Sequence, residues 1–317
     1  MRDHLLNKVF ENILKEDSVG AVDRNLLMKN IEQLKKSKLN IMLVGATGVG
    51  KSSTINAIFD TEIAKVGYSS DPQTSTIEKY EIDNVVLWDT PGLGDSPEND
   101  KRYAIQIVNA LKATDDKGEL LIDEVLVLID GSNKDMKTAY EIIENVIVPF
   151  IGDSKRIVIA INLCDMGLKG RYWNCEDNCP HEQLVAFMNK KVVSVHERIK
   201  DSTGISTMPI YYSALHKYNI SKLLLTMIKN MPETKRFLFM DSLNKNPDIW
   251  NKNDELENYN REIQTEIKGS LSKAVDGAAK GAVAGATVGS LIPIVGPVVG
   301  ATVGAALGFL GGLVEGK

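Results

Sequence analysis

The residues LVGATGVGKSST, 43–54, interrupt a hydrophobic run with a cluster of glycines. The apolar run stops at Val44, three glycines follow within six residues, and a lysine and two serines then begin a predicted helix. Residues 45–52 fit the pattern G-x-x-x-x-G-K-[ST] between a strand and a helix. Glycines let backbone N–H groups approach phosphate oxygens closely, and the helix N-terminus adds partial positive charge. The pattern therefore predicts a phosphate-binding loop.

The residues of this loop divide into backbone and side-chain contacts. The predicted backbone contacts to phosphate come from Gly45, Ala46, Thr47, Gly48, Val49 and Gly50. Lys51 is predicted to reach the β- and γ-phosphates, where it serves as a catalytic residue, and the Ser52 hydroxyl is predicted to ligate Mg²⁺. We therefore expect Mg²⁺ as a cofactor.

Short apolar runs alternate with helical stretches over residues 38–231. The runs are LNIMLV (39–44), VVLWD (85–89), EVLVLID (124–130), KRIVIAIN (155–162) and MPIYYSA (208–214), and the helical stretches are 51–59, 135–148, 182–200 and 218–230. Continuous β-branched runs between helices indicate a parallel sheet buried on both faces, whereas TIEKYEI (76–82) alternates like an edge strand. We predict a three-layer α/β fold with a mostly parallel six-stranded sheet.

Three further segments flank this predicted domain. Residues 1–37 are predicted to form an extension of two amphipathic helices, broken near residues 18–20. Residues 232–268 are predicted to form a polar linker with a helix at 253–268, and residues 269–317 a hydrophobic, glycine-rich helical hairpin.

The composition narrows the classes of protein that remain. The chain of 317 residues carries a net charge of −5, which disfavours a dedicated nucleic-acid binder. Its three cysteines are an odd and sparse set, typical of a reducing compartment. The N-terminal MRDHLLNKVFENILKEDS has charges scattered among its apolar residues, so no signal peptide is predicted. We therefore expect a cytoplasmic protein.

Polar residues at the ends of later strands complete the predicted nucleotide site. Asp89 in VVLWDTPG is predicted to hold Mg²⁺ through a water, and the Gly92 amide to meet the γ-phosphate as a catalytic contact. In INLCD, Asn162 and Asp165 are predicted to choose the base, because a carboxylate can accept from both the N1–H and the exocyclic amine of guanine.

The loop YYSALH follows the last predicted strand and adds Ser213 and Ala214, whose amide is expected to bond the guanine O6. In this order, GATGVGKSSTINAIF, DTPG, NLCD and YYSALH resemble the GTPase class of P-loop proteins. The resemblance covers about residues 38–231. It is nearest to the Era-like and septin-like branches, and the chain is also similar to interferon-inducible (AIG1-type) and chloroplast-import GTPases.

This resemblance implies that the protein binds GTP and GDP and hydrolyses GTP to GDP and phosphate. It places Ser53 near the α-phosphate. It also requires a threonine that closes on Mg²⁺ and the γ-phosphate, for which DPQTSTIEKY offers Thr74, the preferred candidate as catalytic and metal-binding residue, and Thr76.

Two positions depart from the pattern of this class. Leu163 stands where a lysine usually packs along the base, so we expect guanine preference to persist through Asp165, with a weakly discriminating nucleotidase as the alternative. Leu93 stands where many relatives have a glutamine that positions the attacking water. Because leucine cannot form hydrogen bonds with its side chain, we expect slow intrinsic turnover, completed when a homodimer or larger self-assembly forms.

The C-terminal segment has no charged residue in the 34 positions from 281 to 314. Glycine recurs at every fourth position, while Pro293, Gly296 and Pro297 divide the segment into arms of about 277–292 and 298–314. Such glycine stripes let helices approach closely in membranes, whereas in water each glycine costs a helix about 0.8–1 kcal/mol relative to alanine. We expect residues 277–314 to contact the cytoplasmic face of a membrane as a hairpin, with packing on protein or self-assembly as the alternative.

The sequence thus predicts a GTP-hydrolysing switch with a membrane-associating or self-assembling tail. Two alternatives stay open: an Era-like ribosome- or RNA-linked assembly GTPase, and a module that binds GTP with negligible turnover. The acidic balance of the chain and its lack of a basic tail disfavour a nucleic-acid or ribosome partner.

Overall fold

The computed structural model describes residues 24–59, 76–94, 96–115, 118–133, 136–242 and 259–284, together with residues 3, 4, 6–8 and 11. The chain divides into two units. The first, called the sheet unit, comprises Leu39–Met231 with Leu243–Ile263. The second, called the helical unit, comprises Met1–Lys38, Pro232–Ser242 and Gln264–Lys317.

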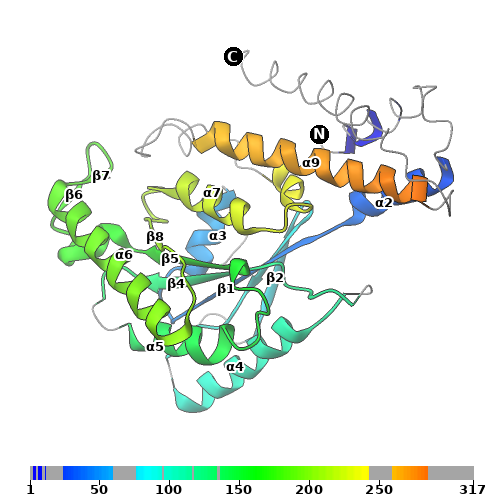
Figure 1. Ribbon diagram of the computed structural model, residues 1–317. Coiled ribbons are helices and arrows are strands. Elements are labelled where there is room, and N and C mark those ends of the chain that lie inside the picture. Colours follow the sequence, from blue (N-terminus) through cyan, green and yellow to red (C-terminus); the bar gives the residue numbers. More distant parts are fainter. Residues whose placement is uncertain are drawn as a thin grey trace. The chain divides into compact units, whose positions relative to one another are not determined.

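The sheet unit alternates strands and helices along the chain (Figure 1). Its strands are β1 (Leu39–Gly45), β2 (Glu78–Ile82), β3 (Val85–Asp89), β4 (Glu124–Asp130), β5 (Ile157–Asn162) and β8 (Ile210–Tyr211), with a small hairpin of β6 (Trp173–Asn174) and β7 (Cys179–Pro180). Its helices are α3 (Lys51–Phe59), α4 (Pro97–Lys112), α5 (Lys137–Ile142), α6 (Glu182–Thr203) and α7 (Ile220–Asn230). Shorter segments are the π-helix η2 (Ile143–Ile147) and the 3-10 segments η3 (Ser154–Arg156) and η4 (Cys164–Gly170).

Six strands form one sheet in the order β2-β3-β1-β4-β5-β8. The neighbours are parallel except β2 and β3, which are antiparallel. Strands β1, β3 and β5 are buried along their whole length, whereas β2, at the edge, has no fully buried residue and alternates between half-buried and exposed positions. This arrangement confirms the predicted mostly parallel six-stranded sheet, because a parallel sheet covered on both faces needs continuous apolar strands.

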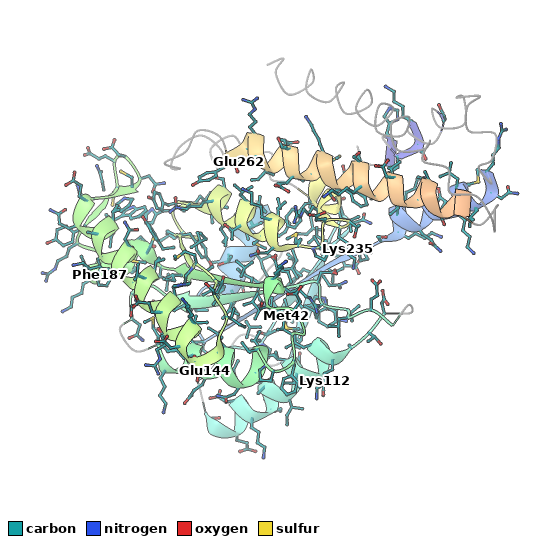
Figure 2. All side chains as sticks on the ribbon, in the orientation of Figure 1. Met42, Lys112, Glu144, Phe187, Lys235 and Glu262 are labelled. Carbon is teal, nitrogen blue, oxygen red and sulfur yellow. The ribbon has the colours of Figure 1, made fainter. Side chains whose placement is uncertain are left out.

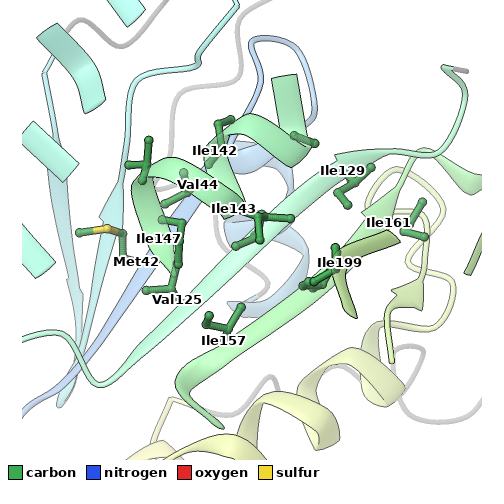
Figure 3. Close-up of a cluster of buried hydrophobic side chains, with 14 of the residues drawn as sticks. Met42, Val44, Val125, Ile129, Ile142, Ile143, Ile147, Ile157, Ile161 and Ile199 are labelled. Atoms are coloured by element: carbon green, nitrogen blue, oxygen red, sulfur yellow. The ribbon is translucent and has the colours of Figure 1, made fainter. Parts of the chain in front are cut away.

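Helices cover both faces of the sheet. Helices α3 and α7 pack on one face, and α4, α5 and α6 cover the other (Figure 1). The hydrophobic cluster under α4, α5 and α6 is drawn in Figure 3, where the labelled members are Met42, Val44, Val125, Ile129, Ile142, Ile143, Ile147, Ile157, Ile161 and Ile199. Figure 2 places Met42 in the interior and Lys112 and Glu144 on the outer helices. Since side chains alternate along a strand, every second residue of β1, β4 and β5 contributes to this cluster.

Helix α4 is absent from the helical stretches that the apolar pattern indicated. Its start carries local signals: Ser96 accepts a hydrogen bond from the Asn99 N–H at 3.3 Å, and Pro97 occupies the first turn. The stretch expected as one helix over 135–148 is instead α5 followed by the π-helix η2, in which the Val148 N–H donates to Ile143 O.

The helical unit contains α2 (Arg24–Lys36), η5 (Arg236–Met240) and most of α9 (Tyr259–Ala284). The Phe237 N–H donates to Ser270 Oγ at 2.9 Å, and Asn30 Nδ2 donates to Ala278 O at 2.9 Å, so both α2 and η5 contact α9. The buried side chains of the unit include Leu27, Ile31, Phe237, Leu238, Phe239, Ile267, Leu271 and Val275. The linker boundary expected at residue 268 falls inside α9, and the helix expected at 253–268 runs on to Ala284.

The predicted glycine-rich hairpin lies mostly outside the described residues, which end at Ala284. At Gly277, the first glycine of the expected stripe, an added Cβ would meet no described atom within 4 Å, so none of the described helices packs closely against it. None of the helices among the described residues is both long and apolar enough to cross a membrane.

Glu124 at the start of β4 is fully buried, and neither of its carboxylate oxygens has a hydrogen-bond partner among the described residues. Burial, and then the charge of Asp123, raise the pKa of the Glu124 carboxyl well above its usual value. A raised folded-state pKa means that the stability is fully present below the unfolded-state pKa and is lost as the pH rises toward the folded-state pKa.

We therefore expect Glu124→Gln to stabilise the protein increasingly as the pH rises above about 5. Relative to the parent, the gain in unfolding free energy is about 1.4 kcal/mol per pH unit, until the folded-state pKa is reached. Urea unfolding at several pH values measures this gain. Glu197→Gln, at an exposed position of α6, is the matched control and shows no such trend. A Glu124→Gln gain that stays constant with pH contradicts the prediction.

Candidate nucleotide-binding site

The loop between β1 and α3 has the backbone shape that its glycines allow. Gly48 and Gly50 have φ of +76° and +88°, a left-handed region in which other residues are strained. A Cβ on Gly45 would lie 2.7 Å from Leu128 O, so a side chain there would displace β4. The predicted phosphate-contacting residues Gly45, Ala46, Thr47, Gly48, Val49, Gly50, Lys51, Ser52 and Ser53 all lie on this loop or on the first turn of α3.

Lys51, the first residue of α3, is almost fully buried. Its Nζ donates to Gly45 O at 3.3 Å and to Ala46 O at 3.1 Å, so the ammonium lies over the loop that precedes it. A cation held in this place supplies positive charge beside the loop amides, as a phosphate site requires.

Ser52 and Asp89 come together from α3 and the end of β3. Ser52 Oγ donates to Asp89 Oδ2 at 2.8 Å, and the other carboxylate oxygen, Oδ1, is buried without a hydrogen-bond partner among the described residues. Burial raises the pKa of Asp89, while the bond from Ser52 and the charge of Lys51 oppose that rise. Oxygen atoms from a hydroxyl and a carboxylate are the ligands that Mg²⁺ prefers, so this pair fits the ion.

The segment after Asp89 pairs with the phosphate loop. The Leu93 N–H donates to Gly45 O at 3.3 Å, and the Thr47 N–H donates to Leu93 O at 3.0 Å. A Cβ on Gly92 would lie 2.4 Å from Thr47 Oγ1, so only glycine allows this approach. The Leu93 side chain is buried in the hydrophobic cluster under α4, α5 and α6 and cannot form hydrogen bonds.

Asn162 joins three loops of the site. Its Nδ2 donates to Val49 O at 2.9 Å in the phosphate loop, and its Oδ1 accepts from the Ala214 N–H at 3.0 Å. Both polar groups of the Asn162 side chain therefore hold neighbouring loops in place. The sequence analysis had instead predicted that this residue helps to select the base. The Ala214 amide, expected to bond guanine O6, already has an acceptor, so a bond to O6 requires it to be shared or exchanged.

Asp165 lies in η4, directly after the Asn162 loop, and is 3% exposed. Its Oδ1 is buried without a hydrogen-bond partner among the described residues. Leu163, between these two residues, is half-buried in the left-handed region with φ of 59°. Ser213 accepts a hydrogen bond through Oγ from the His216 N–H at 3.2 Å, which shapes the neighbouring loop.

Thr74 and Thr76 are the two candidate switch threonines. Thr74 lies outside the described residues, and Thr76 is exposed two residues before β2. The choice between them stays a prediction.

Two residues that the sequence analysis did not single out connect the halves of the site. Thr54 Oγ1 lies 2.6 Å from Tyr212 Oη and also donates to Gly50 O at 2.7 Å. Tyr212 is fully buried and follows β8, so it connects the loop carrying Ala214 to α3. The signal available in the sequence was a tyrosine inside an otherwise apolar run, since a buried hydroxyl needs a partner.

The amino-acid sequence is similar to that of known GTPases over part of its length. Residues 40–163 match the family described as "50S ribosome-binding GTPase". GTPase Der of Orientia tsutsugamushi (strain Boryong) is 26% identical over 223 residues, which is 69% of this chain and 44% of Der. Neuronal-specific septin-3 of Danio rerio is 32% identical over 89 residues, 22% of this chain and 25% of the septin. The chain spans less than half the length of these curated relatives.

Among solved structures, Era in complex with MgGDPNP and nucleotides 1506–1542 of 16S ribosomal RNA is similar. Its sequence is 20% identical, the match covers 62% of this chain and 58% of Era, and the TM-score is 0.44.

Proposed function

We propose that the protein binds GTP with Mg²⁺ and hydrolyses it to GDP and phosphate, because residues 40–163 match a GTPase family and resemble GTPase Der and septin-3. The observation that carries the proposal is the joining of Lys51, Ser52 and Asp89 at one end of the sheet. The separate, buried Asp165 adds a carboxylate oxygen in need of donors.

Each residue contributes a defined interaction. The Lys51 ammonium attracts the β- and γ-phosphates, and Ser52 and Asp89 hold Mg²⁺, which when bound offsets the negative charge of the phosphates. Asp165 accepts from the guanine N1–H and exocyclic amine, and Asn162 holds the loops in register by its bonds to Val49 and Ala214. The Gly92 amide donates to the γ-phosphate.

Calorimetry of the full chain with GTP, GDP and ATP in the presence of Mg²⁺ tests binding, and phosphate release from GTP tests hydrolysis. Tight binding of both guanine nucleotides and much weaker binding of ATP is the expected result. Equal affinity for ATP would instead identify a weakly discriminating nucleotidase. Binding without phosphate release at any protein concentration would identify a static GTP-binding module.

We expect Gly92→Ala to lower GTP hydrolysis by about 100-fold, because its Cβ would push the segment after Asp89 away from Thr47, and displacements of about 1 Å have such effects. GDP affinity changes little, because GDP has no γ-phosphate. Single-turnover phosphate release and GDP titration measure both quantities. Gly269→Ala, where an added Cβ meets no described atom within 4 Å, is the matched control. Unimpaired hydrolysis in Gly92→Ala would argue against the role of this amide.

The second part of the proposal is that a second copy of the chain completes hydrolysis. Leu93 supports it, because its buried apolar side chain cannot position the attacking water. Turnover per molecule should therefore rise with protein concentration, in step with dimer formation followed by analytical ultracentrifugation. Turnover that is independent of concentration across the monomer–dimer transition rules this part out.

We further propose that the protein acts in the cytosol as a switch, with residues 277–314 contacting the cytoplasmic face of a membrane or assembling with other copies. The segment is rich in glycine and has no charged residue from 281 to 314, which supports the proposal. Fractionation should compare the full chain with a chain ending at Ala284, which keeps α9. Release of only the shortened chain from membranes supports membrane contact. Loss of large assemblies without membranes supports self-assembly, and identical behaviour of both chains contradicts the proposal.

A ribosome-linked role is the second candidate, because the description of the matched family names the 50S ribosome. The net charge of −5 argued against it, but charge alone does not exclude a local contact. Sedimentation of the full chain with ribosomes, in GTP and in GDP, distinguishes the candidates. Nucleotide-dependent co-sedimentation that survives moderate salt supports the ribosome-linked role.

A further inference from the structure

The base-reading carboxylate has a histidine beside it. Asp165 Oδ2 lies 3.9 Å from His216 Nε2, while Oδ1 has no hydrogen-bond partner among the described residues. The distance is too long for a direct hydrogen bond but close enough for an ion pair when the imidazole is protonated. The two oxygens that guanine needs are therefore in unequal positions, and one of them faces a group that can become a cation.

Several contacts hold His216 in this place. Its backbone N–H donates to Ser213 Oγ at 3.2 Å, and its carbonyl accepts from Asn178 Nδ2 at 2.8 Å. The imidazole lies 4.7 Å from the Trp173 ring at an interplanar angle of 36°, and Trp173 in turn meets Tyr218 edge-on at 5.5 Å. The β6–β7 hairpin thus positions the ring against Asp165, and the His216 side chain is 27% exposed.

We propose that His216 controls access to Asp165: the protonated imidazole pairs with Oδ2 and excludes the guanine base, so nucleotide binding and this ion pair are mutually exclusive. The inference rests on the proposed binding of guanine nucleotides. A shift of about 1 Å brings Nε2 within hydrogen-bond distance of Oδ2. Because the carboxylate is buried, that charge-assisted bond forms away from bulk water and competes directly with the two guanine donors.

The test varies the pH within the range from about 5 to 8, because histidine side chains in general change charge there. The other ionisable residues on the elements that contact His216 are Asp165 on η4, Lys217 and Tyr218 in its own loop, and Cys175, Glu176, Asp177 and Cys179 on the hairpin. The hairpin residues that contact His216, Trp173 at its ring and Asn178 at its carbonyl, do not titrate. Asp165 is the carboxylate within ion-pair distance, which is why protonation of His216 acts on the base site rather than on the phosphate loop.

The test measures the affinity of the full chain for GDP with Mg²⁺ between about pH 5.5 and 7.5. The terminal phosphate of the nucleotide also titrates near about pH 6, so the informative quantity is the ratio of parent to variant affinity. For His216→Gln, and independently for His216→Asn, we expect this ratio to change by about tenfold across the range. At low pH the affinity of the parent for GDP should fall more than that of either variant. Calorimetry in buffers of different ionisation enthalpy should show more proton release on GDP binding for the parent than for either variant.

His196→Gln is the matched control. His196 lies on α6 in the same sheet unit, but its Nδ1 is 2.7 Å from Thr207 O and contacts that carbonyl instead of Asp165. It should retain the pH profile of the parent. A parallel profile for the parent and both His216 variants would overturn the inference while leaving the proposed function intact. Failure of the parent to bind GDP at any pH would overturn both, so the two failures are distinguishable.

Discussion

Asp165→Asn should reduce the affinity for GTP and GDP by about 100-fold while leaving the protein folded. The carboxylate offers two acceptors to the two guanine donors, whereas the amide offers one acceptor and points a donor at another donor. Each hydrogen bond to a charged group is worth about 1.5–3 kcal/mol, and about 1.4 kcal/mol corresponds to a factor of ten. Calorimetric titration with GDP and Mg²⁺ measures the loss.

A nucleotide whose base has an acceptor in place of one guanine donor should bind the variant better than GDP does, and so tests for a gain of binding. Xanthosine diphosphate presents an oxygen where guanosine diphosphate presents the exocyclic amine, so Asp165→Asn should recover affinity for it. Asp201→Asn, exposed near the end of α6, is the control and keeps the guanine preference of the parent. If Asp165→Asn still prefers guanine as strongly as the parent, another residue reads the base. The roles proposed for Asn162 and His216 beside Asp165 would then be wrong.

Lys51→Met should lower GTP hydrolysis by about 10²–10³-fold, the effect of removing one preorganised charge-stabilising group from a phosphoryl-transfer site. Methionine keeps the length and flexibility of the side chain, and the lysine is almost fully buried, so the change removes mainly the charge and the bonds to Gly45 O and Ala46 O. Phosphate release under single-turnover conditions measures the effect, and the affinity for GTP should also fall.

Lys190→Met is the appropriate comparison, since Lys190 is exposed on α6 and outside the site. Circular dichroism of both variants separates a loss of charge from a loss of fold. Hydrolysis by Lys51→Met at the rate of the parent would show that this ammonium is not near the γ-phosphate. The description of the site as a phosphate-binding loop would then need another source of positive charge.

The sheet was predictable because its signals are local. Each buried strand is a continuous apolar run, whereas the edge strand alternates between apolar and polar residues. The position of each strand and whether it is central or at the edge therefore follow from a few neighbouring residues. Helix α4 was overlooked because its residues are more polar than those runs, although Ser96 and Pro97 mark its start by a capping bond that depends only on adjacent residues. The π-helical end of α5 and the two-residue length of β8 were not visible in the apolar pattern.

The candidate site divides in the same way. The phosphate loop could be identified from the sequence because eight consecutive residues carry both the glycines and the lysine that the chemistry needs. Asp89, Asn162 and Asp165 were placed by motif, since each lies at or just after the carboxyl end of a predicted strand, where the loops of the site meet. The motifs did not reveal the hydrogen bonds between their residues. In the structure, the Asn162 side chain bonds to the backbone of Val49 and of Ala214.

The sequence by itself therefore determined the α/β class and predicted the phosphate loop and the candidate residues for reading guanine, because these depend on short spans with a fixed period or spacing. Only the tertiary structure decided the pairings: Ser52 with Asp89, 37 residues apart, Asn162 with Val49, 113 apart, and Thr54 with Tyr212, 158 apart. It also decided that His216 faces Asp165. Such pairings depend on strand order and on which loops meet at the sheet edge, and these follow from the packing of the whole chain rather than from any local pattern.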